Sequence, residues 1–231
     1  MWLLFALGSA FFAGITAALA KLGIHGHDST LVTALRTSVV FLGAWIVAAI
    51  SIKGHFASEL TAITPHTYLF LFLSGLATGA SWLCFFAALS RAPVTLVSPI
   101  DKSSTIIAIA FAVTFLGERL SPIARIGVLA LASGITLTLE PGVLKSLVSQ
   151  YAKHPTNAPL PDAQKAPRAS WIIFALASAI FAALTSILGK VGITGVDSNL
   201  GTAVRTSVVL AMAWIVVALH AKQASIRTIP L

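Results

Sequence analysis

The sequence predicts an all-α integral membrane protein, a bundle of about seven transmembrane helices. Of its 231 residues, 57% are hydrophobic and only 10% are charged, and the mean hydropathy is +0.94. The apolar residues are collected into runs long enough to cross a hydrocarbon core, which takes about 20 residues of α-helix. The runs show no period-two alternation, and a backbone within lipid must satisfy its own hydrogen bonds, so helices are expected rather than a barrel.

The expected spans follow one another along the chain. They cover residues 2–20, 31–52, 67–90, 94–116, 123–139, 171–189 and 200–219. The first run ends in Ala-Leu-Ala, as a cleaved signal peptide would, but it lacks a basic leading region and recurs in mid-chain, so we expect a span. Asp28, Ser29 and Thr30 are N-cap residue types and precede the second span.

Residues 141–170 have a different composition and are predicted to be a linker. They hold five of the ten prolines and four basic residues. Their first part allows two interpretations, a short helix lying on the membrane surface or a disordered stretch. Short loops rich in Lys and Arg usually stay in the cytoplasm, so we expect a cytoplasmic linker and an external N-terminus.

The formal charge of +8 does not indicate a nucleic-acid partner. The basic residues are scattered singly between apolar runs, whereas a nucleic-acid surface would gather them. The expected partners are instead the lipid bilayer and a small-molecule substrate. Cys84 is the single cysteine, so no disulfide can form within the chain.

An internal repeat is the most informative feature. Shifting the chain by 169 residues aligns residues 2–50 with 171–219, and 29 of 49 positions are identical. The first unit has five predicted helices, an odd number, and the polar linker is not expected to cross. The second unit is therefore predicted to enter the membrane inverted, as in many secondary transporters that alternate access around a midplane site.

The predicted organisation has three parts: a five-helix unit over 1–140, the linker over 141–170, and the first two helices of a second unit over 171–231. A complete second unit would add three more helices. We expect either a truncated second unit or a second copy or another chain that supplies the missing helices.

Several short motifs occur in an order and spacing that resemble one family. They are KLGI at 21–24 with DS at 28–29, ALRT at 34–37, SGLATGASWLC at 74–84, PIDK at 99–102 and LGER at 116–119. The chain resembles the EamA-type domain of the drug/metabolite transporter superfamily, in its short five-helix form. The resemblance implies ten helices in two repeats, and export or exchange of small metabolites across the inner cell membrane. This sequence departs from that pattern in having seven predicted helices.

Asp101 and Lys102 interrupt the fourth apolar run and are candidate substrate-pathway residues. They lie about 10 Å along the helix from Val94, and a charge at the membrane centre costs about 2.5–3.5 kcal/mol unless it faces a cavity or a partner. Pro99 removes a backbone donor nearby. The alternative is a structural salt bridge. Because adjacent helical residues point about 100° apart, the two are not expected to pair with each other.

Arg36, Arg205 and Trp82 complete the candidate pathway. Each arginine lies about one turn into its span, where it could snorkel to the headgroups, or could partner Asp101 or an anionic substrate. Trp82 shares a helical face with Phe85, Phe86 and Leu89, which indicates packing or an aromatic cavity wall. Gly75 and Gly79 form a GxxxG pattern expected to allow close helix packing.

No catalytic, cofactor or metal site is expected. His25 and His27 lack counterparts in the second unit, and nucleotide-binding and hydrolase motifs are missing from the sequence. The sequence therefore favours a secondary-active transporter of small metabolites or drugs. The alternative from another class is a non-transporting remnant, or an assembly partner that supplies helices to another transporter chain.

Overall fold

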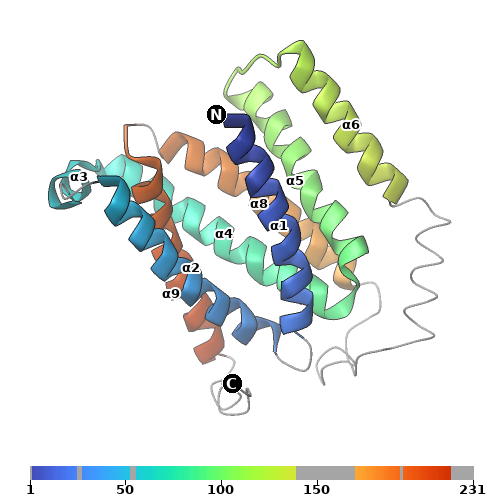
Figure 1. Cartoon of the computed structure of the whole chain (residues 1–231), viewed down its shortest axis with the longest axis horizontal. Helices are drawn as coiled ribbons and strands as arrows, with labels where there is room; N and C mark the ends of the chain where they lie inside the picture. The colour runs from blue at the N-terminus through green and yellow to red at the C-terminus, as the bar shows by residue number, and fades with distance from the viewer. Residues whose placement is uncertain (1, 25–27, 53–55, 139–169, 193–194, 220–231) are drawn as a thin grey trace.

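The computed structural model is built from helices around a central α4, and it describes residues 2–24, 28–52, 56–138, 170–192 and 195–219 (Figure 1). Its helices are α1 (Trp2–Gly23), α2 (Ser29–Ile52), α3 (Phe56–Ala62), α4 (Pro65–Arg91), α5 (Val94–Phe115), α6 (Pro122–Thr138), α8 (Ser170–Gly192) and α9 (Ser198–Leu219). Six of the described helices are long and apolar enough to cross a membrane, and α6 is a shorter apolar helix of 17 residues. The predicted all-α membrane bundle is confirmed.

Matching aspartates begin the second helix of each unit. The Asp28 carboxylate accepts hydrogen bonds from the backbone N–H groups of Thr30 (2.9 Å) and Leu31 (3.3 Å). Asp197 does the same for the N–H groups at 199 (2.9 Å) and 200 (3.0 Å). These bonds satisfy helix N–H groups that have no partner within the helix. The N-cap predicted at Asp28 is confirmed.

Two features of the chain differ from the expectation or lie outside the described residues. The short helix α3, seven residues long, was not predicted, because seven residues are too few to give a clear apolar period. In Figure 1 it lies at one edge of the bundle, between α2 and α4 in the sequence. The surface helix considered for the first part of the linker falls outside the described residues.

The helices α2 and α9 pack against each other in opposite directions. The Trp45 indole donates to the Ser207 hydroxyl at 3.1 Å, and the Trp214 indole donates to the Ser38 hydroxyl, also at 3.1 Å. These are equivalent residues of the repeat, 169 apart, joined reciprocally. Position 38 faces 214 while 45 faces 207, so the helices are antiparallel. The reciprocal contacts agree with the inverted relation predicted for the two units.

The first helix of the second unit, α8, packs against both α4 and α5 (Figure 1). Hydroxyl groups link α8 to α4: Ser74 donates to the Thr185 carbonyl (3.0 Å), and the Thr78 and Thr185 hydroxyls lie 3.2 Å apart. Small and hydroxyl-bearing residues let membrane helices approach closely and hydrogen-bond across the contact. The first helix of the second unit therefore packs against helices of the first unit and does not form a separate domain.

The GxxxG pattern of α4 faces α9. A Cβ atom added to Gly75 would lie 2.6 Å from Val208 Cβ and 2.9 Å from the Arg205 carbonyl oxygen. At Gly79 an added Cβ would lie 2.7 Å from Met212 Sδ, at the far end of a flexible side chain. The close packing predicted from the two glycines is confirmed, and its tightest point is Gly75.

Candidate functional site

Asp101 is buried where α5 meets α8, and it is held by a short chain of hydroxyl groups. The Ser178 hydroxyl of α8 donates to Asp101 Oδ1 at 2.7 Å. Ser178 in turn contacts Ser81 of α4, whose hydroxyl donates to the Ser178 carbonyl at 3.1 Å. Only 12% of the Asp101 side chain is exposed. One carboxylate thus joins the first unit to the inverted second unit.

Lys102 corrects one sequence-based expectation. Its Nζ lies 3.4 Å from Asp101 Oδ2, so the two adjacent residues do contact each other. The expectation that they would not pair was wrong, because it considered only the directions of the Cα–Cβ bonds. The long lysine stem can fold back, and 56% of the Lys102 side chain remains exposed. The pair therefore joins a buried carboxylate to a mostly exposed ammonium group.

Arg36 and Trp82 meet where α2 faces α4. The Arg36 guanidinium lies 4.3 Å from the centre of the Trp82 ring and 5.7 Å from that of Phe86. Such cation–π contacts stabilise a cation away from water. Phe86 and Leu89 are buried in the core, as the packing interpretation requires, whereas Trp82 is half-buried. Arg36 therefore finds an aromatic partner in place of the proposed Asp101 partner.

Arg205 occupies a third location, where α9 meets α4 and α8. A Cβ added at Gly189 would lie 3.4 Å from Arg205 Nη1 and 3.4 Å from Ser74 Oγ. The small glycine thus leaves room for the guanidinium near α8. The five predicted pathway residues therefore form three separate groups. Arg36 with Trp82, and Arg205 alone, both contact α4. Asp101 with Lys102 reaches α4 through Ser178 and Ser81.

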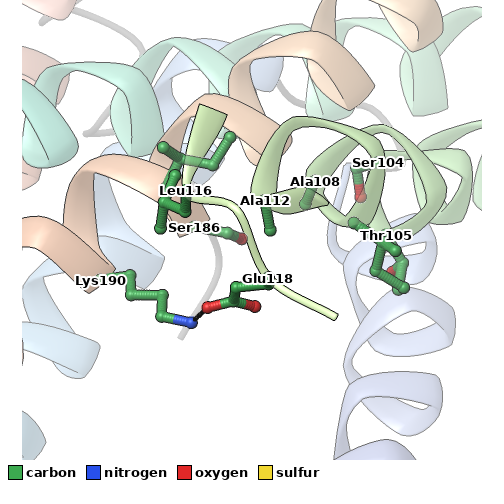
Figure 2. Close-up of a pocket in the computed structure, with 10 residues that line it drawn as sticks. Ser104, Thr105, Ala108, Ala112, Leu116, Glu118, Ser186 and Lys190 are labelled. Atoms are coloured by element: carbon green, nitrogen blue, oxygen red, sulfur yellow. Dashed lines mark ion pairs between the residues drawn. The ribbon is translucent and has the colours of Figure 1, made fainter. Parts of the chain in front are cut away.

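The structure reveals a pocket that the sequence did not predict. It lies between α5 and the last turns of α8, with a volume of about 250 Å³ (Figure 2). Its lining residues are Ser104, Thr105, Ala108, Ile109, Ala112, Leu116, Glu118, Ser186, Ile187 and Lys190. Lys190 forms an ion pair with Glu118. In Figure 2 this pair lies at one end of the lining residues, and Ser104 and Thr105 lie at the other.

Two signals could have pointed to this pocket. Glu118 belongs to the LGER motif, and Lys190 is the repeat equivalent of Lys21. Neither residue lies deep within an apolar run, so neither carries the large transfer cost that singled out Asp101. Among the described residues, no cluster of three His, Cys, Asp or Glu side chains could hold a metal ion.

Comparison with known proteins agrees with this architecture. The model of the EamA-like transporter family matches residues 1–140. The chain is also 41% identical over 136 residues to an uncharacterized transporter in the cobO 3′ region of a Sinorhizobium species, a match that covers 59% of this chain and 94% of that relative. No solved structure matches. Together with the apolar helices, these matches indicate a multi-pass membrane transporter rather than an enzyme, and the chain belongs to the EamA-like transporter family.

Proposed function

We propose that this protein is a secondary-active transporter that exports or exchanges small metabolites or drugs across the inner cell membrane. The inverted relation of the two units supports this function, because alternating access uses two units of opposite orientation that move against each other. Asp101 carries the proposal. It is a buried carboxylate within a membrane helix, and ionisable groups retained there usually serve a transport route.

The position of Asp101 suggests how it would act. Its Oδ1 atom is bound by Ser178 of the second unit, and its Oδ2 atom faces a Lys102 side chain that is mostly exposed. The carboxylate could therefore release Lys102 to a solute without losing its place in the bundle. A movement between the units would change the Ser178 contact, which would link solute binding to the movement of α8.

The substitution Asp101→Asn tests this role. Asparagine keeps an oxygen that can accept the Ser178 hydroxyl, and it loses the negative charge and the contact with Lys102, whose side chain is mostly exposed. We expect normal membrane yield and loss of substrate efflux. Both would be measured in the same cells, in the complete assembly, with a panel of amino acids, amines and drugs as substrates.

Asp101→Leu provides the matched control, because it removes both the charge and the acceptor of the Ser178 hydroxyl. The Ser178 hydroxyl would keep only its 3.3 Å contact with the Ser81 hydroxyl. Losing a buried hydrogen bond costs about 0.5–1.5 kcal/mol, so this variant should accumulate less. If Asp101→Asn also loses yield, the carboxylate is structural. If Asp101→Asn exports normally, Asp101 is not part of the route.

The exposed surface of α1 favours a second proposal, that this chain assembles with further helices. In α8 the residues Ala175, Ser178 and Ala179 are buried against α4 and α5. Their repeat equivalents in α1 are Ala6, Ser9 and Ala10, and all three are exposed. The occupant that fits this surface is a helix pair like α4–α5, with a carboxylate placed to accept from Ser9. A chain that supplies helices to another transporter would need the same surface.

A further inference from the structure

The pocket between α5 and α8 has polar groups at both ends and apolar walls between them. In Figure 2, Ala108 and Ala112 lie between the ion-paired Lys190 and Glu118 at one end and Ser104 and Thr105 at the other. Its volume of about 250 Å³ would hold about eight water molecules at roughly 30 Å³ each. A chamber of this size can take a small organic solute.

The hydroxyl groups at the end away from the ion pair are available to such a solute, and Thr105 is exposed there. Ser103 and Ser186 donate to carbonyl groups of their own helices, at Ile100 (2.6 Å) and Ala182 (3.1 Å). Ser104 and Thr105 make no such bond within the described part of the chain, and both line the pocket. Two hydroxyls without helix partners therefore offer both donors and acceptors to a bound molecule.

The ion pair at the other end joins the loop after α5 to the last turn of α8. Its side chains are 54% exposed at Lys190 and 41% exposed at Glu118, so water can compete with the contact. Exposed ion pairs are weak and open readily. Lys21, the repeat equivalent of Lys190, instead donates to the carbonyls of Leu89 (2.5 Å) and Ala92 (3.0 Å) at the end of α4. The two lysines lie beyond opposite ends of α5.

We propose that this pocket is a solute-binding chamber bounded at one end by the Lys190–Glu118 ion pair, which limits access from that end, and that it selects small hydrogen-bonding solutes without net charge. A solute with net charge would meet one attractive and one repulsive side chain at the entrance, and would leave its charge uncompensated among the apolar walls. This inference rests on the proposed transport function only in that a solute bound in the chamber would then be carried across the membrane. Access to the chamber can be measured without transport.

The test places a thiol at the end of the pocket away from the ion pair. The variant Cys84→Ala with Ser104→Cys would be treated in membranes with three methanethiosulfonates, one neutral (hydroxyethyl), one anionic (sulfonatoethyl) and one cationic (trimethylammonioethyl). Rates would be divided by those of a free thiol. When the Lys190–Glu118 ion pair is intact, we expect the neutral reagent to react fastest with the introduced thiol.

Breaking the pair should change both rate and charge preference. Lys190→Gln should raise neutral labelling about two- to fivefold, the factor that an exposed ion pair of ordinary strength contributes, and should favour the cationic reagent because Glu118 remains. Glu118→Gln should favour the anionic reagent. Lys21→Gln is the matched control and should leave all three rates unchanged.

Two outcomes would overturn the inference. No labelling of the introduced thiol in any variant would show that the pocket is not accessible to solutes. Labelling that is equal with and without the ion pair would show that Lys190 and Glu118 do not limit access to it. If the unsubstituted protein shows the expected labelling pattern but no efflux in the complete assembly, that result would count against the transport function alone.

Discussion

The helices α1 and α8 have closely similar sequences and very different surroundings. Ala6, Ser9 and Ala10 recur as Ala175, Ser178 and Ala179. None of the apolar stretch of α1 is buried, whereas 28% of that of α8 is. Burial is thus set by the helices available to pack against, because α8 lies against α4 and α5 and α1 makes few contacts with either.

The second helices of the two units behave in the opposite way, because they share one interface. The Trp45–Ser207 and Trp214–Ser38 hydrogen bonds have the same length and join α2 to α9 reciprocally. The repeat is therefore structurally symmetric where its copies contact each other, and asymmetric where each copy contacts something else. Substitutions at equivalent positions of the two units test this difference.

The largest difference is expected between Ala179→Leu and Ala10→Leu. Ala179 is 1% exposed, so a leucine there would be forced between closely packed helices at a cost of about 3 kcal/mol. Ala10 is exposed, and its leucine would project outward. Thermal stability of the purified chain in detergent would be measured for both.

The same pair also tests the surface proposed on α1. If Ala10→Leu leaves this chain stable but abolishes transport by the complete assembly, a helix pair covers that surface. If both substitutions are harmless in every assay, α8 does not depend on its packing against α4 and α5, and the comparison between α1 and α8 fails.

An intermediate effect is expected for Gly75→Ala. The added Cβ would meet the Arg205 carbonyl, which is backbone and cannot move alone, so a loss of about 1–3 kcal/mol is predicted. Val208→Ala should not restore stability fully, because the carbonyl contact remains. Gly79→Ala should cost less, since the flexible Met212 side chain can move aside.

The repeat supplies an internal control for this prediction. Val39, the equivalent of Val208, is 71% exposed, so Val39→Ala should have little effect. Thermal stability and the yield of folded protein would be compared across the four variants. Equal losses at Gly75 and Gly79 would show that the closest approach of α4 and α9 is not at Gly75.

The smallest effects are expected for Trp45→Phe and Trp214→Phe. Each removes one indole hydrogen bond, and hydrogen bonds between membrane helices contribute about 0.6 kcal/mol on average. Because the bonds are reciprocal, the two losses should be equal within error. Thermal stability would be measured for each single variant and for the double variant, which tests additivity. Unequal losses in the two single variants would contradict the symmetry inferred for α2 and α9.

Sequence alone determined the membrane class, the positions of the long helices and the repeat. Apolar length fixes a span independently of its neighbours, and an Asp at position 28 can cap a helix using only the local backbone. The GxxxG pattern also predicted close packing, because a glycine removes a side chain whatever its partner is.

Tertiary structure decided which groups meet. The sequence identified Asp101 by its cost within an apolar run, but its Ser178 partner comes from 77 residues away. Arg36 could have reached a carboxylate or an aromatic ring, and packing of α2 against α4 placed Trp82 beneath it. The Lys190–Glu118 pair likewise depends on α8 lying beside α5. Contacts between distant helices depend on the whole packing arrangement, whereas a span depends only on its own residues.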